Sequence, residues 1–182
     1  YDDNPEGYGE WLWQILEIAE NKAKDGAIMF VFQAMLNVRK FSEWFPREWR
    51  VLAASSNFVQ MRKIEMQYAF DPCIVWWKDG EKYSEMTLNR DWYVGNTANT
   101  LNRKDGEGYG HPCPRPLDQM RHIVNQWVKS NDKVFDPFMG SGTTGVACIQ
   151  TSRKFTGIEI DPDYYEIAKR RIKEALMQPR LI

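Results

Sequence analysis

The chain has 182 residues, of which 43% are hydrophobic and 14% aromatic. This composition excludes a disordered tail and predicts a single globular domain over residues 1–182 with one sizeable core. The 24 Lys and Arg residues nearly cancel the 25 Asp and Glu residues, so net charge argues neither for nor against a nucleic-acid partner.

The first half of the chain predicts alternating helices and strands. Apolar residues at helical spacing predict a helix over 11–23, which Gly26 closes, and a second helix over 37–45. The continuous apolar run at 27–34 predicts a central strand that is buried on both faces. Two further strands are expected at 49–60 and 71–78, with a polar segment between them.

Periodicity disappears over 79–110, where Gly, Asn and Asp are frequent, so we expect an irregular insertion there. The segment mixes basic and aromatic side chains, which suit contacts with phosphates and stacking on bases. We therefore predict a target-recognition region for DNA, with a surface excursion as the alternative. The residues predicted to contact DNA are Lys82, Arg90, Arg103 and Lys104.

The remainder of the chain predicts a strand-helix-strand-helix unit that follows a helix at 116–130. Its strands are expected at 132–136 and 154–161, and its helices at 142–152 and 162–176. This alternation predicts the α/β class, with a mostly parallel sheet, right-handed crossovers and helices on both faces.

A glycine-rich loop joins the first of these strands to its helix. Gly140, Gly142 and Gly145 fall in a G-x-G-x-x-G frame, and Glu159 stands at the end of the next strand. This order predicts a nucleotide-type ligand, with a turn that only packs strand against helix as the alternative.

The side chains around the loop argue against a dinucleotide. Asp136, at the carboxyl end of the strand, would repel a pyrophosphate but suits a ligand with an ammonium and a sulfonium group. The hydroxyls of Ser141, Thr143 and Thr144 suit an amino-acid carboxylate at a helix N-terminus. A cofactor that is half nucleoside and half zwitterionic amino acid fits better, and S-adenosylmethionine is that cofactor.

Three motifs carry a resemblance to a known family. DPFMGSGT at 136–143 resembles the S-adenosylmethionine loop of the DNA amino-methyltransferases, in the permuted group whose loop lies near the C-terminus. GIEIDP at 157–162 is similar to the second motif of that family. HPCPRP at 111–116 resembles the segment before the loop, with Pro114 and Arg115 in place of the common Gln and Lys.

The resemblance implies a Rossmann-like methyltransferase fold and methyl transfer to the exocyclic amine of adenine or cytosine in double-stranded DNA. Glu159 would accept hydrogen bonds from the ribose hydroxyls, and Asp136 would lie near the amino group of the cofactor. Arg115 would face the carboxylate end of the cofactor. The residues predicted to bind the cofactor are Asp136, Pro137, Phe138, Gly140, Ser141, Gly142, Thr143, Glu159, Ile160, Asp161 and Arg115.

The Asp-Pro-Pro-Tyr type motif, with which this family binds the amino group of the target base, is not found in the sequence. No catalytic residue is therefore assigned. In the permuted order the motif precedes the helix at 11–23, so at least one central strand is expected upstream of Tyr1. A cofactor- or nucleic-acid-binding relative without catalysis and a methyltransferase acting on RNA or protein stay open as alternatives.

Cysteine spacing and hydropathy indicate the state of the thiols and the cellular location. Cys73, Cys113 and Cys148 lack CxxC spacing, which predicts buried free thiols and no metal site. The sequence has no apolar run of about 18 residues and no signal peptide, so a cytoplasmic location without a membrane partner is expected. A homodimer is one assembly that the sequence leaves open.

Overall fold

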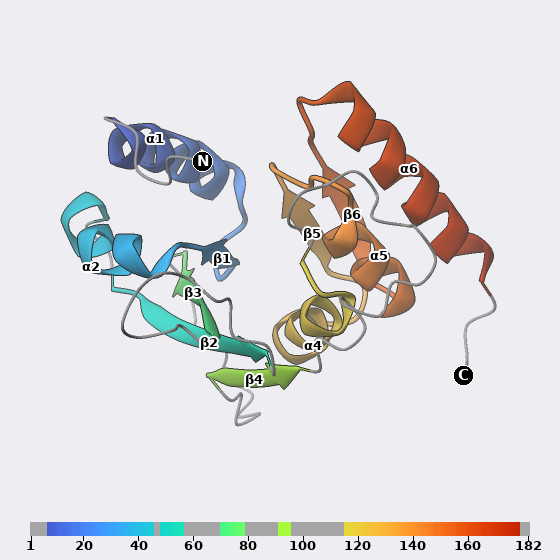
Figure 1. Ribbon diagram of the computed structural model, residues 1–182, viewed down its shortest axis with the longest axis horizontal. Helices are drawn as coiled ribbons and strands as arrows, with labels where there is room; N and C mark the ends of the chain where they lie inside the picture. Colours follow the sequence, from blue (N-terminus) through green and yellow to red (C-terminus); the bar gives the residue numbers. More distant parts are fainter. Residues whose placement is uncertain (1–6, 46–47, 57–69, 79–90, 96–114, 179–182) are drawn as a thin grey trace, which may run out of the picture. The chain divides into compact units, whose positions relative to one another are not determined.

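The computed structural model describes residues 7–45, 48–56, 70–78, 91–95 and 115–178. The chain divides into two compact units, Tyr1–Val94 and Gly95–Ile182 (Figure 1). That the two form a single domain stays a prediction. Among the described residues, no helix has the length and apolar character needed to cross a membrane.

The first unit contains a four-stranded sheet in the order β1-β3-β2-β4. Its third strand, β3, runs antiparallel to both β1 and β2, with Val75 opposite Phe30 and Cys73 opposite Leu52. The strands are β1 (Ile28–Phe32), β2 (Arg50–Ser56), β3 (Phe70–Trp77) and β4 (Trp92–Gly95).

This pairing corrects the predicted mostly parallel sheet. Because β1 and β2 are both antiparallel to β3, they share one direction, as a strand-helix-strand crossover through α2 (Met35–Trp44) requires. However, β3 lies between them. The sequence predicts no helix between β2 and β3, and strands joined without a crossover helix pair antiparallel. The two strands joined through α2 are therefore parallel to each other, but they are not neighbours in the sheet.

The structure also corrects which strand of this sheet is buried. Residues Cys73 to Trp76 of β3 are at most 3% exposed, whereas β1 is half-buried along its whole length. The reason is position, since β3 has a partner strand on each edge and β1 is the end strand of the described sheet. The apolar run at 27–34 did not by itself show whether its strand lies in the middle or at the end of the sheet.

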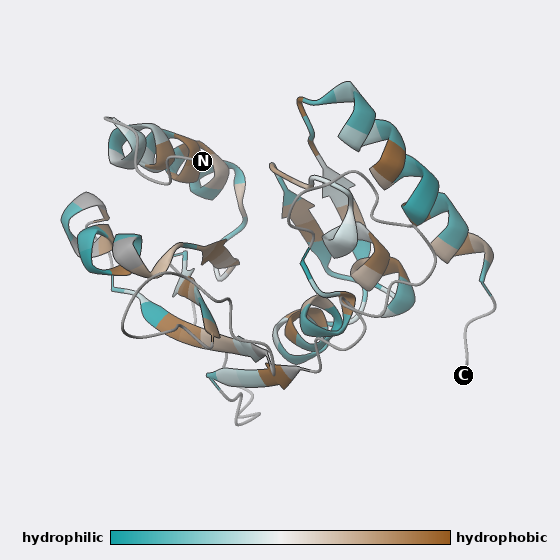
Figure 2. Ribbon diagram, in the orientation of Figure 1, coloured by the Kyte–Doolittle hydropathy of each residue, from teal (hydrophilic) through white to brown (hydrophobic). Residues whose placement is uncertain are grey.

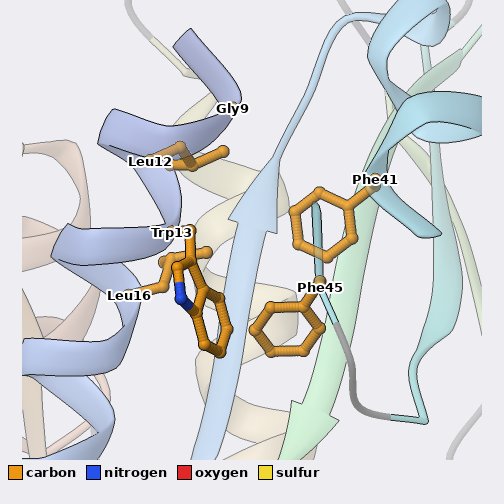
Figure 3. Close-up of a pocket in the computed structure, with 6 residues that line it drawn as sticks. All are labelled: Gly9, Leu12, Trp13, Leu16, Phe41 and Phe45. Carbon is orange, nitrogen blue, oxygen red and sulfur yellow. The ribbon is translucent and has the colours of Figure 1, made fainter. Parts of the chain in front are cut away.

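The core of the first unit joins two helices to β3. Leu12 and Leu16 of α1 (Tyr8–Lys22) belong to one buried cluster with Phe41, Phe45 and Trp76. A hollow among the helix side chains is lined by Gly9, Leu12, Trp13, Leu16, Phe41 and Phe45 (Figure 3). It is too small to admit a water molecule, so it is core packing and not a ligand site.

The second unit confirms the predicted strand-helix-strand-helix order. β5 (Lys133–Asp136) and β6 (Lys154–Gly157) are parallel, with Asp136 opposite Gly157, and α5 (Thr143–Gln150) connects them. The flanking helices α4 (Leu117–Trp127) and α6 (Pro162–Met177) both contact α5. This packing leaves α5 largely buried.

Helix α6 shows how the second unit presents one face to solvent. It is mostly hydrophilic along its length (Figure 2), and its buried residues Ala168 and Ala175 are seven positions apart, on one face. Small side chains on that face let α6 approach α5 closely. The approach brings α6 up to the loop that precedes α5.

Candidate functional site

The glycine-rich loop at 137–142 runs from the carboxyl end of β5 to the first residue of α5. The Ile158 amide donates to the Asp136 carbonyl at 2.9 Å, and the Met139 amide donates to the Ile158 carbonyl at 3.0 Å. The loop is thus bonded to the chain directly after β6. The carboxyl ends of both strands and the loop form one continuous edge.

Asp136 supplies the first carboxylate of this edge. Its Oδ1 accepts from the Phe138 amide at 3.0 Å, and its Oδ2 accepts from the Thr144 hydroxyl at 2.7 Å. Burial raises the pKa of Asp136 above its ordinary value of 3.8, and the nearby charge of Glu159 raises it further, against the opposing effect of the two hydrogen bonds. A cation that approached this carboxylate would offset its desolvation.

Glu159 supplies the second carboxylate and holds the loop. Its Oε2 accepts from the Gly140 amide at 2.8 Å, and its Oε1 accepts from the Asp161 amide at 2.9 Å. The sequence did not reveal these contacts. Each carboxylate oxygen has a further lone pair, so Glu159 has the capacity to accept from two ligand hydroxyls while it anchors the loop.

Two of the three glycines are explained by close packing. Gly142 has φ of 79°, and a Cβ there would lie 2.8 Å from the Cβ of Ala168 on α6. A Cβ on Gly145 would lie 2.5 Å from Cδ1 of Ile172 and 2.8 Å from Cε1 of Phe155. The glycine frame therefore serves the packing of α5 on α6 and β6, whether or not a ligand is bound.

Gly142→Ala is expected to lower the free energy of unfolding by about 2 kcal/mol or more, from left-handed backbone strain together with the clash at Ala168. Urea unfolding measures the loss. Gly7→Ala is the matched control, because Gly7 has φ of 82° with nothing within 4 Å of its Cβ position. If both variants lose the same stability, the clash with α6 contributes nothing.

Two large apolar side chains of the edge face solvent. Phe138 in the loop is 55% exposed, and Ile160, next to Glu159, is 97% exposed. These exposures show that neither residue is a core residue. Apolar side chains beside a few fixed polar groups are typical of a ligand site.

The hydroxyls of the loop contact a residue that the sequence did not single out. Ser141 and Thr143 are 3% and 5% exposed, and Nη1 of Arg171 on α6 donates to Ser141 Oγ at 3.0 Å and to Thr143 Oγ1 at 3.3 Å. Arg115, predicted to act beside these hydroxyls, is half-buried ahead of α4. The sequence shows Arg171 one helical turn after Ala168, but that spacing does not by itself point to the loop.

Asp161 has a structural role of its own. Its Oδ1 accepts from the Asp163 amide at 2.9 Å and from the Tyr164 amide at 3.1 Å, so it is the N-cap of α6. Pro162 follows in the first turn, where a missing amide hydrogen costs nothing. A place for Asp161 beside a nucleoside stays a prediction.

The predicted DNA-contacting residues Lys82, Arg90, Arg103 and Lys104 lie outside the described residues. Within the segment 79–110 the structure describes 91–95, and there it corrects the predicted irregular conformation. These residues include the strand β4, and the Asp91 carbonyl before it accepts from the Ala53 amide of β2 at 2.8 Å.

The described cysteines are free and buried, as predicted for Cys73 and Cys148. Burial, with the charge of Asp136, raises the pKa of Cys148 to about 12, so this thiol stays protonated at neutral pH. Within the described ranges, no group of three or more His, Cys, Asp or Glu side chains is arranged to hold a metal ion.

Comparison with known proteins finds a matching family and relatives of known class. Residues 1–170 match the N6_N4_Mtase family, described as DNA methylase. The Type II methyltransferase M2.LlaDCHI of Lactococcus lactis subsp. cremoris is 40% identical over 94 residues, which are 52% of this chain and 34% of that protein. M.BglI of Bacillus subtilis is 28% identical over 163 residues, which are 84% of this chain and 41% of that protein. The chain thus spans less than half the length of these two relatives.

Solved structures show the same fold. The M1.HpyAVI-SAM complex superposes with a TM-score of 0.72 at 23% identity, over 93% of this chain and 85% of that chain. PvuII DNA methyltransferase (cytosine-N4-specific) has a TM-score of 0.72 at 17% identity, over 96% of this chain and 72% of that chain. The α/β class predicted from the sequence is therefore confirmed.

Proposed function

This chain belongs to the DNA methylase family, and we propose that it forms the S-adenosylmethionine-binding part of a DNA methyltransferase. The reaction proposed for the whole protein transfers a methyl group to the exocyclic amine of adenine or cytosine. One observation carries the proposal, namely that Asp136 and Glu159 present two carboxylates at the shared edge of β5 and β6. The description of the matching family as DNA methylase supports DNA as the substrate.

The chemistry of the edge fits the two ends of this cofactor. The desolvated Asp136 carboxylate suits the ammonium group of the methionine part, and Glu159 has lone pairs for the two ribose hydroxyls. Phe138 and Ile160 offer exposed apolar surface to the nucleoside. The proposed site comprises Asp136, Pro137, Phe138, Gly140, Ser141, Gly142, Thr143, Glu159, Ile160, Asp161 and Arg115.

When bound, the cofactor supplies an electrophilic methyl group on its sulfonium. The residues of this chain would bind the cofactor and orient it, which contributes to the rate through positioning. No acceptor for the amine of the target base is assigned, because the sequence lacks an Asp-Pro-Pro-Tyr type motif. We assign the chain to the permuted group with a Rossmann-like sheet, in which the cofactor loop follows the segment proposed to recognise DNA, 79–110.

Calorimetric titration of the 182-residue chain with S-adenosylmethionine and, separately, NAD tests the cofactor. We expect selective binding of S-adenosylmethionine, since a pyrophosphate would meet the Asp136 carboxylate. Incorporation of radiolabelled methyl groups into DNA tests the reaction. Selective binding of NAD would overturn the proposed cofactor, and cofactor binding without transfer would limit the chain to a binding role.

A further inference from the structure

A single guanidinium spans the turn that leads into α5. Besides the two hydroxyl contacts, Nη1 of Arg171 donates to the backbone carbonyl of Ser141 at 2.5 Å. Ser141 and Thr143 flank Gly142, whose positive φ sets the direction of the turn. The contact joins residues about 30 positions apart, so α6 restrains the loop from outside it.

Arg171 lies beside the N-terminus of α5, where a cation needs nearby hydrogen-bond acceptors. The N-terminus of α5 carries the positive end of the helix dipole, which disfavours a nearby guanidinium. The hydroxyl oxygens of Ser141 and Thr143 accept from Arg171, so their hydrogens point away from it. The guanidinium thus fixes both the backbone of the turn and the orientation of its two buried hydroxyls.

We propose that Arg171 is a positioning residue for cofactor binding, which acts by holding the turn at 141–143 in its binding-competent form. The Gly140 amide, directly before this turn, donates to Glu159, and the Gly142 amide, within the turn, donates to the Met139 carbonyl at 2.8 Å. If the turn adopts this form only part of the time, the apparent Kd equals the intrinsic Kd divided by the fraction of molecules in that form. The effect on the ligand rests on the function proposed above, whereas the ordering of the turn does not.

Arg171→Gln and Arg171→Lys test the proposal in the full 182-residue chain. Lysine keeps the charge, but its Nζ ends one bond short of the position of Nη1, the atom that makes all three contacts, so both variants are expected to behave alike. Arg170→Gln is the matched control, because Arg170 is the neighbouring, exposed arginine on α6. Each protein is measured without ligand by amide hydrogen exchange and with S-adenosylmethionine by calorimetry.

We expect the Gly140 and Gly142 amides to exchange about 10-fold faster in both Arg171 variants, and the Kd for S-adenosylmethionine to rise about 10-fold or more. The Val128 amide, which donates to the Val124 carbonyl at the end of α4, belongs to neither the loop nor α6 and should keep its protection. The Arg170 variant should match the unchanged protein in all three measurements.

Three results would overturn the proposal: unchanged loop exchange and affinity in Arg171→Gln, full affinity in Arg171→Lys, or equal loss of protection at Val128. The first would show that the contact is idle, the second that charge alone matters, and the third that Arg171 only stabilises the fold. Faster loop exchange in the Arg171 variants, with no binding of S-adenosylmethionine by the unchanged chain, would support the ordering of the turn by Arg171 but overturn both the proposed function and the role in cofactor binding.

Discussion

Glu159→Ala is expected to weaken the binding of S-adenosylmethionine by about 100-fold or more. The carboxylate would accept from two ribose hydroxyls, and hydrogen bonds to a charged group contribute about 1.5–3 kcal/mol each, so the loss of both exceeds two powers of ten in Kd. The substitution also releases the Gly140 and Asp161 amides that the carboxylate now holds. Calorimetry gives the Kd directly.

A second substitution at this position separates the two roles of Glu159. Glu159→Gln keeps one carbonyl oxygen, so it retains part of the loop anchor but loses the second acceptor. We expect it to fall between the unchanged chain and Glu159→Ala. Glu174→Ala, at an exposed position on α6, is the control for loss of a carboxylate. Unchanged affinity in Glu159→Ala would mean that this residue serves the loop alone.

The part of the site that the sequence predicted is the part built from neighbouring residues. Asp136, the glycine loop and Glu159 follow consecutive strands, and parallel strands joined by a helix bring their carboxyl ends to one edge. The chain order therefore determines where these residues lie. The N-cap role of Asp161, just before Pro162 at the start of α6, is equally local, but it was not predicted.

What the sequence missed depends on contacts between distant segments. The clash that excludes a side chain at Gly142 comes from Ala168, and the partner of Ser141 is Arg171. Neither contact has a periodic signal, since both depend on how closely α6 approaches the loop. The place of β3 between β1 and β2 is a similar case, because strand order is a property of the assembled sheet.

Asp136→Asn is expected to remove the pH dependence of cofactor binding and to raise the Kd about 10-fold or more, through loss of a charged partner for the ammonium group. In the unchanged chain the carboxylate must be ionised to bind that group. Because burial raises its pKa above 3.8, the affinity should fall as the pH drops through this raised pKa and should level off near the affinity of Asp136→Asn, in which the side chain is always neutral. Calorimetry over a pH series measures both effects.

The ionised Asp136 carboxylate should lower the stability of the ligand-free chain, although it strengthens cofactor binding. A raised pKa means that the folded chain holds this proton more tightly than the unfolded chain, so Asp136 lowers stability as the pH rises from 3.8 through the raised pKa. Asp136→Asn should therefore be more stable than the unchanged chain above that pKa, although it binds cofactor less tightly. Asp163→Asn, at an exposed position in the first turn of α6, should leave cofactor binding unchanged and lower stability by about 0.3–1 kcal/mol, through loss of a negative charge at the helix N-terminus. A carboxylate that lowers stability but strengthens binding is expected where a cationic ligand completes the site. If Asp136→Asn lost both stability and affinity, Asp136 would have only a structural role.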